Sequence, residues 1–393
     1  MKTPILTQED GEIVLVYEGK EPEEDIIKKT VPAVLKERHR SGQQEAIVSW
    51  TDMLVYGNNL NVLKALGEFE SVAGEVRCVY IDPPFATGRV LNGVHGSRTE
   101  RGEPSAYDDT LKGAKFLENL RKRLVLIREL MAEDGSIYVH IDWKMSHYVR
   151  ILMDEVFGPE HFVNEITRVK ANPKNFERPA YGNVKDTILF YSKGDDYIWN
   201  GSNEPLTKDD IERLFPQVDE NGKRYTTNPL HAPSETKSGP TGQVWHVRGR
   251  DLWPPKGRHW RYPPDRLTVL DNQGLIEWSS TGNPRKKIYA DDAQKKGKKR
   301  QDIWKDFLDP AYPRYPTEKN LDMLKNIIEA SSGPDDIVLD AYCGSGTTLV
   351  AASLSGRRWI GIDNSKVALR VAQERLHEDV KKPAYPIAVY DAS

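Results

Sequence analysis

Residues 335–356 read DDIVLDAYCGSGTTLVAASLSG, a succession that predicts a β-strand, a glycine turn and an α-helix. The turn carries Gly344 and Gly346, and glycines there let the backbone pass close under a ligand, where a side chain would clash. A turn of this kind at the carboxyl end of a parallel strand forms the usual nucleotide-binding crevice. The stretch therefore predicts an α/β fold with a nucleotide-like ligand at this edge of the sheet.

Strand and helix patterns alternate on both sides of this stretch. Apolar runs of strand length and segments of helical spacing follow one another, which is typical of a doubly wound, mostly parallel sheet. Strands are expected at 53–57, 76–81, 136–142, 187–193, 335–342 and 357–363. Helices are expected at 59–66, 116–131, 149–158, 321–331, 347–356 and 367–376.

The alternation stops between about 195 and 305, where Gly, Pro, Lys and Trp are frequent and apolar runs are short. One α/β domain with an inserted region explains this pattern better than two independent domains. The predicted parts are an N-terminal arm (1–45), a first half of the α/β domain (46–194), the inserted region (195–305), a second half (306–380) and a C-terminal tail (381–393).

The inserted region carries positive charge on an acidic protein. The 393-residue chain has a net charge of -3, but residues 231–305 contain 16 Lys and Arg against 8 Asp and Glu. Five of the nine tryptophans lie in or beside this segment: Trp245, Trp253, Trp260, Trp278 and Trp304. A basic, aromatic-rich segment indicates a polyanion-binding region, although a solvated charged face explains the charge alone equally well.

Several classes of protein are not expected. No apolar run approaches the roughly 18 residues of a membrane span, and the first residues, MKTPILTQEDGEIV, do not have the pattern of a signal peptide. Only Cys78 and Cys343 occur, far apart in the sequence. Neither a disulfide framework nor a cysteine-based metal site is therefore expected, and the composition predicts a cytoplasmic protein.

The residues around the glycine turn indicate S-adenosylmethionine as the ligand. Asp363 ends the strand after the turn, where a carboxylate can accept both hydroxyl protons of a ribose. The turn lacks the third glycine of the dinucleotide pattern and the lysine of a phosphate loop, so a ligand with an adenosine but no pyrophosphate fits better. The predicted cofactor site comprises Asp340, Cys343, Gly344, Ser345, Gly346, Thr347, Thr348, Asp363 and Asn364.

A second strand ends in the sequence VYIDPPFATG (79–88). Because the carboxyl ends of parallel strands meet at one edge of a sheet, this stretch is expected beside Gly344. Proline fixes φ and leaves its carbonyl free of the local turn. The predicted catalytic residues are Asp82, Pro83, Pro84 and Phe85, with the Asp82 carboxylate and the Pro83 carbonyl as acceptors for one amino group and Phe85 as a stacking face.

Such a pocket fits a planar base with an exocyclic amine. The amine lone pair is delocalised into the ring, and two acceptors for its protons favour a pyramidal nitrogen whose lone pair points at an incoming methyl group. Catalysis is then positioning plus electrostatics, without a covalent intermediate. Neither cysteine follows a proline, so the Pro-Cys nucleophile of carbon-5 cytosine methylation is missing.

The two motifs together resemble the DNA amino-methyltransferase family, in its adenine-specific branch and permuted β-class order. In that order a D-P-P-Y/F motif comes first, a target-recognition region follows and the cofactor glycines come last, as 82–85 and 340–348 do here. The segments LVYGNNLNVLKAL (54–66) and RYPTEKNLDMLKNII (314–328) are also similar to family segments. GRHWRYPPDRL and QDIWKDF resemble stretches in the modification subunits of type III restriction systems.

This resemblance implies a Rossmann-like, circularly permuted methyltransferase fold and further cofactor contacts. The contacts fall on Gly57, Asn58, Asp82, Pro316, Thr317 and Lys319. The family usually has aspartate where this sequence has Asn58, whose amide oxygen can still accept from the cofactor adenine. The resemblance also implies a homodimer and a separate restriction subunit as candidate partners.

Double-stranded DNA is the expected substrate, and the target base must leave the duplex to reach Asp82. Phosphate contacts are expected from 168–178 and from the basic part of the inserted region. Sequence specificity is expected within 195–305, where Arg, Lys, Asn and Gln can pair with base edges. The predicted DNA-binding residues are Lys170, Lys174, Arg248, Arg250, Arg258 and Arg261.

Three other interpretations stay open. Cytosine amino methylation uses similar pocket chemistry, although that branch usually carries serine in place of Asp82. A non-catalytic DNA-binding protein with a methyltransferase fold would not require Asp82, Gly344 and Asp363 to be present together. A nicotinamide-dependent dehydrogenase is disfavoured by the incomplete glycine pattern. Transfer of a methyl group into DNA separates these interpretations.

Overall fold

The computed structural model of the chain divides into two compact units. The large unit comprises Met1–Gly201 and Gln301–Ser393, and the small unit comprises Ser202–Arg300. The small unit thus falls within the inserted region expected at 195–305. The residues that the structure describes are 5–9, 12–41, 50–84, 90–91, 107–108, 113–171, 179–234, 239–280, 282–315 and 318–393.

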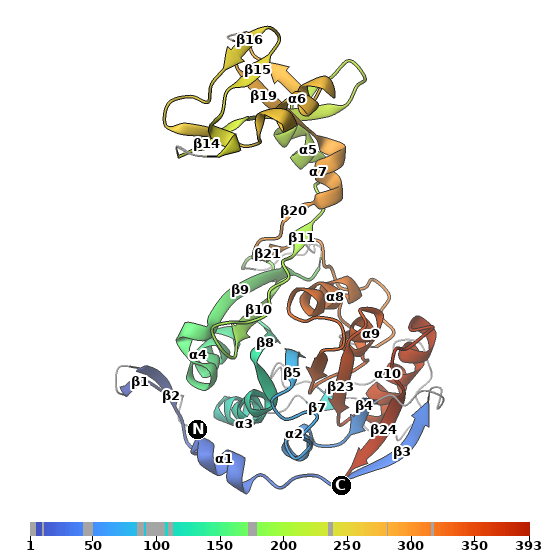
Figure 1. The fold of residues 1–393 in the computed structure, drawn as a ribbon. Helices are drawn as coiled ribbons and strands as arrows, with labels where there is room; N and C mark the ends of the chain where they lie inside the picture. Colours follow the sequence, from blue (N-terminus) through green and yellow to red (C-terminus); the bar gives the residue numbers. More distant parts are fainter. Residues whose placement is uncertain are drawn as a thin grey trace. The chain divides into compact units, whose positions relative to one another are not determined.

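A ten-stranded sheet forms the centre of the large unit (Figure 1). Its strand order is β21-β9-β10-β8-β5-β22-β23-β4-β24-β3. The run from β8 to β24 is parallel, β10 is antiparallel to both of its neighbours, and β3 is antiparallel to β24. The strands are β3 (Leu35–Ser41), β4 (Asp52–Tyr56), β5 (Val76–Ile81), β8 (Met131–Ile141), β9 (Phe162–Val169), β10 (Lys185–Ser192), β21 (Ile303–Trp304), β22 (Ile337–Asp340), β23 (Arg358–Asp363) and β24 (Ile387–Ala392).

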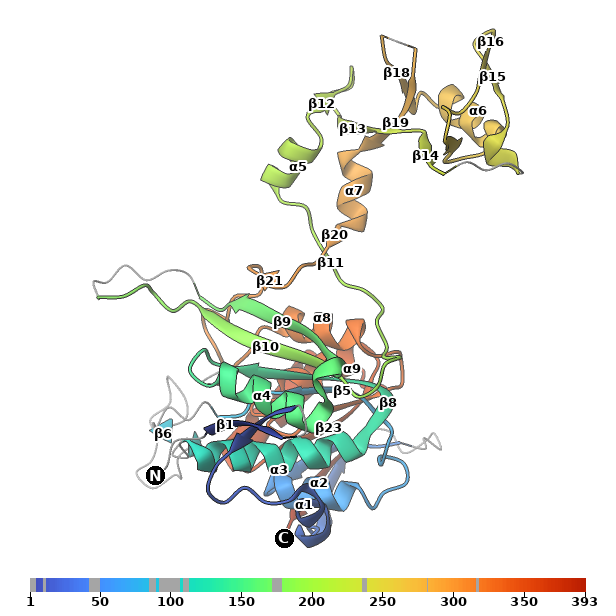
Figure 2. The ribbon, with the colours of Figure 1, turned by 90° about the vertical axis from the view of Figure 1, so that its left-hand side faces the viewer.

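Helices cover both faces of this sheet (Figures 1 and 2). One layer contains α2 (Asn59–Leu66), α3 (Ala114–Leu130) and α4 (Ser146–Phe157), and the other contains α8 (Leu321–Ala330), α9 (Thr347–Leu354) and α10 (Lys366–Asp379). Residues of β5 alternate between them: Val79 and Ile81 pack in the core of the first layer, and Cys78 and Tyr80 in that of the second. Strands covered on both faces are apolar throughout. The predicted doubly wound, mostly parallel Rossmann-like sheet is confirmed.

The chain order places two distant segments side by side at the centre of the sheet. β22 pairs with β5 on one side and with β23 on the other. The chain continues from β5 through α3 to β8, and from β22 through α9 to β23, so the connections diverge in opposite directions from this pair. Ligands bind outside the carboxyl ends of the strands at such a switch point. Asp82 follows β5 and the glycine turn follows β22, so both lie at this point.

The terminal segments contain more structure than the expected arm and tail. The segment 1–45 contains a hairpin of β1 (Ile5–Glu9) and β2 (Glu12–Val16), helix α1 (Glu23–Lys29) and strand β3. The segment 381–393 contains β24, which lies between β4 and β3 in the sheet. The β3 sequence LKERHRS is mostly exposed and charged, so no apolar alternation marks it as a strand. Strands β9 and β21 were likewise not predicted.

The small unit has its own core around Trp245, Trp260 and Leu267. Its four-stranded sheet has the order β12-β13-β19-β18, comprising β12 (Gln217–Val218), β13 (Arg224–Pro229), β19 (Pro284–Tyr289) and β18 (Ile276–Trp278). The two-stranded pairs are β11 (Asn203–Glu204) with β20 (Lys298–Lys299), β14 (His231–Pro233) with β17 (Arg258–Trp260), and β15 (Trp245–Val247) with β16 (Arg250–Leu252). The helices are α5 (Lys208–Leu214), α6 (Pro264–Asn272) and α7 (Ala290–Lys296).

Short elements complete the described structure. They are the 3-10 helices Pro159–His161 and Pro240–Gly242 and the pair β6 (Val90–Leu91) and β7 (Tyr107–Asp108). Among the described residues, no helix is long and apolar enough to cross a membrane.

Candidate active site

The carboxylate of Asp82 lies directly beyond the end of β5. Its Oδ2 is 3.0 Å from Nζ of Lys319. Its Oδ1 is buried and accepts no hydrogen bond from the described part of the chain, and Nδ1 of His140 lies 4.0 Å away. Because a buried acceptor without a donor costs free energy, this oxygen is suited to a donor that a ligand supplies. Pro83 is buried, Pro84 is half-buried, and Phe85 lies outside the described residues.

Lys319 connects the cofactor half of the sheet to Asp82. It lies just before α8, in the segment that the resemblance assigns to the cofactor pocket. Its side chain is only 12 % exposed, so its ion pair with Asp82 is better shielded from water than a surface pair. The pair engages Oδ2 and leaves Oδ1 as the carboxylate oxygen of Asp82 that has no donor among the described residues.

A buried chain of polar side chains that was not predicted lies behind Asp82. Tyr80 Oη is 2.7 Å from Nδ1 of His140. Nε2 of His140 is 3.4 Å from Oδ2 of Asp186, and Lys170 Nζ is 2.7 Å from the other oxygen of that carboxylate. These residues come from β5, β8 and β10 and the end of β9. A signal for His140 was available, since it lies near the end of a predicted strand, at the edge that carries Asp82.

Electrostatics keep the imidazole in this chain neutral. Burial lowers the pKa of His140. Burial alone would raise the pKa of Asp186, but hydrogen bonds from His140 and Lys170 outweigh it and hold that pKa well below its usual range. Because an ionised carboxylate only accepts, we assign the proton of His140 to Nε2, which faces Asp186, and this tautomer leaves Nδ1 to accept from the Tyr80 hydroxyl. Lys170, predicted to contact phosphate, therefore has a carboxylate partner, and its DNA contact stays a prediction.

The buried side chain of Arg375, on α10, holds the glycine turn. Its Nη1 donates to the Ser345 carbonyl at 3.2 Å and to Thr347 Oγ1 at 2.7 Å. On the other side of the turn, Thr348 Oγ1 donates to Asp340 Oδ2 at 2.5 Å. These side chains shape the turn, and their predicted cofactor contacts stay predictions. The sequence offers no signal for Arg375, which is 28 residues from Thr347.

The two glycines of the turn are required for different reasons. Gly346 has φ +76°, and a Cβ there would lie 2.8 Å from the Cβ of Ala372, so packing within the protein excludes a side chain. Gly344 has φ +49°, but among the described residues a Cβ there would meet nothing closer than the Tyr342 carbonyl at 4.0 Å. The described residues thus leave the space beside Gly344 open, which fits the close backbone approach of S-adenosylmethionine.

Asp363, at the end of β23, reaches back to the same turn. Its Oδ2 accepts from the backbone N–H of Gly344 at 2.9 Å and its Oδ1 from that of Ser365 at 2.8 Å. Each oxygen keeps a lone pair for a further donor, such as a ribose hydroxyl. Burial raises the pKa of Asp363 to about 6 and that of Asp340 to about 7. A bound cation or hydroxyl donor favours the charged carboxylate, so this acid set fits a sulfonium ligand with an adenosine.

Gly57 and Asn58 follow β4, at the same edge of the sheet. A Cβ on Gly57 would lie 2.6 Å from the Cβ of Ala392, so the close approach of β24 requires glycine here. The Asn58 side-chain oxygen accepts from the backbone N–H of Leu60 at 3.1 Å and from Nη2 of Arg123 at 3.2 Å. Asn58 therefore caps α2, and its contact with the cofactor adenine stays a prediction.

The other predicted residues fall into three groups. Cys343 is buried beside the turn, and Asn364 is exposed next to Asp363. Lys174, Pro316 and Thr317 lie outside the described residues. The four predicted arginines of the small unit are all exposed: Arg248, Arg250, Arg258 and Arg261.

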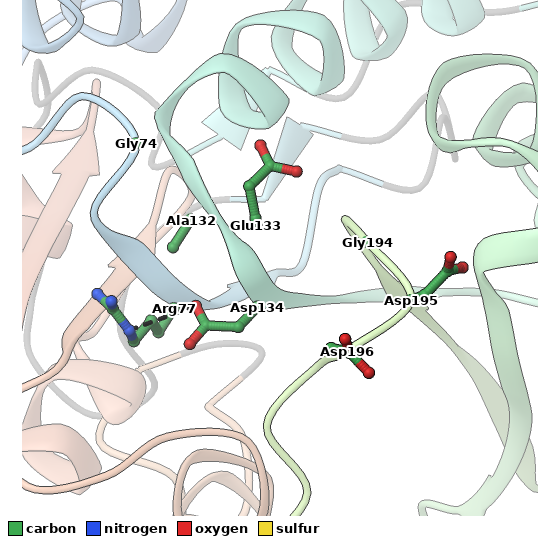
Figure 3. Close-up of a pocket in the computed structure, with 8 residues that line it drawn as sticks. All are labelled: Gly74, Arg77, Ala132, Glu133, Asp134, Gly194, Asp195 and Asp196. Atoms are coloured by element: carbon green, nitrogen blue, oxygen red, sulfur yellow. Dashed lines mark ion pairs between the residues drawn. The ribbon is translucent and has the colours of Figure 1, made fainter.

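A recess of about 550 Å³ lies away from this site, at the amino-terminal edge of the sheet (Figure 3). It is lined by Gly74, Arg77, Ala132, Glu133, Asp134, Gly194, Asp195 and Asp196. Arg77 pairs with Asp134 at 3.4 Å, and the remaining charged groups are carboxylates. Arg77 lies near the start of β5 and Asp82 beyond its end, so the recess is distinct from the predicted site.

Comparison with known proteins identifies the family. The sequence profile described as DNA methylase matches residues 76–374. Type II methyltransferase M.EcaI of Enterobacter cloacae is 39 % identical over 380 residues, which cover 95 % of this chain and 79 % of that protein. The Mod subunit of the type III restriction-modification enzyme EcoP15I of Escherichia coli is 24 % identical over 378 residues, which cover 80 % of this chain but only 58 % of that subunit. The solved M1.HpyAVI–SAM complex has 17 % identity and a TM-score of 0.41, with 82 % of this chain and 100 % of that chain covered.

The family profile spans strands β5 and β22 and the small unit between them. It therefore includes both motifs on which the resemblance rested, D-P-P-F and the glycine turn. The predicted family and the predicted cofactor are confirmed. The chain belongs to the DNA methylase family, and S-adenosylmethionine is its methyl donor.

Proposed function

We propose that the protein methylates the exocyclic amino nitrogen of a flipped adenine at a specific site in double-stranded DNA. The buried Oδ1 of Asp82 carries this proposal, because it lies at the switch point of the sheet and accepts no hydrogen bond from any residue that the structure describes. An acceptor there suits an exocyclic amine, because the amine donates N–H hydrogen bonds. Aspartate rather than serine at this position supports adenine over cytosine, by resemblance to the adenine-specific branch.

The residues around Asp82 have separate tasks in this reaction. When bound, S-adenosylmethionine supplies an electrophilic methyl group beside the glycine turn. Asp82 Oδ1 accepts one amine proton, and we assign the second to the Pro83 carbonyl, which draws the nitrogen lone pair out of the ring plane. Lys319 keeps Oδ2 paired and so restrains rotation of the carboxylate. The surplus proton of the methylated nitrogen leaves through Asp82 as general base.

We further propose that the small unit recognises the DNA sequence and that the protein acts in a restriction-modification system. The small unit is basic, with 19 Lys and Arg against 13 Asp and Glu. One relative is named a type II methyltransferase and another a Mod subunit of a type III restriction-modification enzyme. A homodimer and a separate restriction subunit follow from the same likeness as predictions.

Identification of the modified base tests the proposal. Purified protein, tritium-labelled S-adenosylmethionine and unmethylated bacterial DNA are incubated, and the DNA is digested to nucleosides and separated by chromatography with mass detection. We expect label in N6-methyladenine. Label in N4-methylcytosine would replace adenine by the cytosine alternative, and absence of label with folded, cofactor-binding protein would contradict a catalytic function.

Lys319→Met is expected to lower kcat by on the order of 10- to 100-fold, with little change in the KM for DNA, because the Asp82 carboxylate loses its restraint. Steady-state kinetics with labelled cofactor measure both constants. Lys382→Met, at an exposed lysine of the large unit, is the matched control and should behave as wild type. Unchanged kcat with weaker cofactor binding would instead place Lys319 in the cofactor pocket.

Cofactor affinity is expected to fall as the pH is lowered through about 6. Burial raises the pKa of Asp363 to about 6, so above that pH the carboxylate is charged and accepts hydrogen bonds from the ribose. Below it the dissociation constant should rise about tenfold per pH unit. Isothermal titration calorimetry between about pH 5 and pH 8 measures this dependence. Asp363→Asn should bind weakly at every pH and lose the slope that Asp363 causes.

The free energy of unfolding of the ligand-free protein should show the opposite pH dependence to cofactor affinity: the contribution of Asp363 and Asp340 increases as the pH is lowered. The pKa values of Asp363 and Asp340 in the folded chain are about 6 and about 7, above those of exposed aspartates. The folded state therefore binds more protons than the unfolded state between about pH 4 and pH 7, and the contribution of these groups falls as the pH rises through that window. Thermal unfolding of wild type and Asp363→Asn over the same window isolates the contribution of Asp363. Cofactor affinity that increases toward low pH would contradict the assignment of the charged Asp363 carboxylate as the acceptor for the ribose hydroxyls.

A further inference from the structure

The hairpin β15–β16 of the small unit has a rigid two-residue tip. Val247 pairs with Arg250, which leaves Arg248 and Gly249 as the turn. Their φ angles are +51° and +73°, and positive φ at both central residues defines the turn type that matches the twist of a hairpin. The direction of the side chains that flank the turn is therefore fixed by the backbone.

The base of the hairpin is anchored in the core of the small unit. Trp245 is almost completely buried and its Nε1 donates to Thr268 Oγ1 at 3.0 Å. Its ring stacks on Trp278, with centroids 5.6 Å apart and planes at 22°, and contacts Trp260 edge-on. These contacts of Trp245 fix the base of the hairpin in the core of the small unit, so the residues at its tip have a defined position within that unit.

Two arginines of the hairpin lie over Trp278, and their donors are used differently. The guanidinium carbons of Arg248 and Arg250 are 4.7 Å and 5.3 Å from the Trp278 ring centroid. Arg248 donates from Nε and Nη2 to Asp271 at 3.2 Å and 3.0 Å, so these two donors already have a partner within the small unit. Within the described residues, the side chain of Arg250 is exposed and forms no hydrogen bond or ion pair, while its backbone pairs with Val247 in the hairpin.

The other two predicted arginines resemble Arg248 rather than Arg250. Arg258 Nη1 lies 3.1 Å from Nδ1 of His231. Arg261 Nε donates to the Pro229 carbonyl at 3.2 Å. Arg250 therefore stands apart among the four predicted arginines, because its guanidinium lies over the Trp278 ring while its side-chain N–H donors have no partner in the described structure. An ordered side chain with free donors loses less entropy when it binds.

We propose that Arg250 reads a guanine in the major groove of the target DNA, with the hairpin β15–β16 as the reading element. This inference rests on the proposed function, since it requires DNA as the substrate. A two-stranded ribbon fits the major groove, and the paired N–H donors of arginine match O6 and N7 of guanine. The Arg248–Asp271 pair supports the tip, and the surrounding basic residues of the small unit neutralise phosphates.

Arg250→Ala tests this assignment, with Arg266→Ala, at an exposed arginine of α6, as the matched control. Each full-length protein selects duplexes from a randomised pool, in the presence of a non-reactive cofactor analogue, and the bound DNA is sequenced. We expect the DNA motif selected by Arg250→Ala to lose its preference for guanine at one position, or at two related positions if the motif is symmetric. Binding of the variant to the wild-type motif should be weakened roughly 5- to 150-fold. The control motif should be unchanged.

The salt dependence of binding separates a base contact from a phosphate contact. For a base contact, the slope of log affinity against log salt concentration should be unchanged in Arg250→Ala. A slope reduced by about one, with weaker binding to all sequences alike, would show a phosphate contact and overturn the proposal. An unchanged motif in the variant would overturn it as well. Because selection does not require methylation, absence of methyladenine would contradict the proposed function while this result still decides the role of Arg250.

Discussion

Asp82→Ala is expected to lower methyl transfer into DNA by on the order of 10³-fold, with a much smaller loss of cofactor affinity. The substitution removes the buried Oδ1 that accepts no hydrogen bond from the described residues, and with it the acceptor for the target amine. The amine lone pair then stays in the plane of the base. Single-turnover incorporation of labelled methyl groups measures the chemical step, and calorimetry measures cofactor binding to the same variant.

Two further variants separate charge, shape and stability at this position. Asp82→Asn keeps an acceptor oxygen of the same shape without the charge, so we expect activity between those of wild type and Asp82→Ala. Alanine also leaves Lys319 without its carboxylate partner, so Asp82→Ala/Lys319→Met should melt at a higher temperature than Asp82→Ala alone. Asp82→Ala with near wild-type turnover would contradict the assignment of Asp82 as the amine acceptor.

Gly344→Val is expected to weaken S-adenosylmethionine binding by about 10- to 100-fold while the fold is retained. A Cβ at this position meets no atom of the described residues closer than 4.0 Å, so the added methyl groups occupy the open space that we assign to the cofactor. The φ of +49° makes any side chain there cost about 1–2 kcal/mol of stability. Calorimetric titration measures the affinity, and thermal unfolding measures the strain.

Gly356→Val is the matched control for this prediction. Gly356 follows α9 and has φ +70°, and a Cβ there would also meet no atom within 4 Å in the part of the chain that the structure describes. A valine there would therefore impose the same kind of backbone strain as Gly344→Val. It would do so at the other end of α9, away from Asp363 and the glycine turn. We expect a similar loss of stability with cofactor affinity unchanged. Equal losses of affinity in both variants would mean that Gly344→Val acts through general destabilisation.

The central part of the fold was predictable because its strands are mostly apolar and buried. The stretches before Asp82, Gly344 and Asp363 are buried on both faces, and their composition alone marks them as strands of a parallel sheet. The common edge of such strands then brings together side chains that are far apart in sequence. This reasoning was sufficient to place Asp82 and the glycine turn at one edge of the sheet, after the neighbouring strands β5 and β22.

Contacts that depend on how helices and loops pack on that sheet were not predictable. Lys319 and Arg375 are charged residues in polar segments, and nothing local indicates that one pairs with Asp82 and the other holds the glycine turn. His140 lies in a predicted strand, but its partners come from two other strands whose order only the folded sheet determines. β3 was missed because its charged residues face solvent at the sheet edge.

The paired strands β11 and β20 give the small unit the properties of an exchangeable module. Asn203 is opposite Lys299 and Glu204 is opposite Lys298, so the chain enters and leaves the unit through neighbouring backbone segments. A Lys298–Glu204 ion pair of 3.1 Å ties the two segments together. A gene segment that encodes a different unit between these strands would need to preserve only this short junction. If the small unit recognises the DNA sequence, as we propose, one recombination event changes the methylated sequence and leaves Asp82 and the glycine turn untouched.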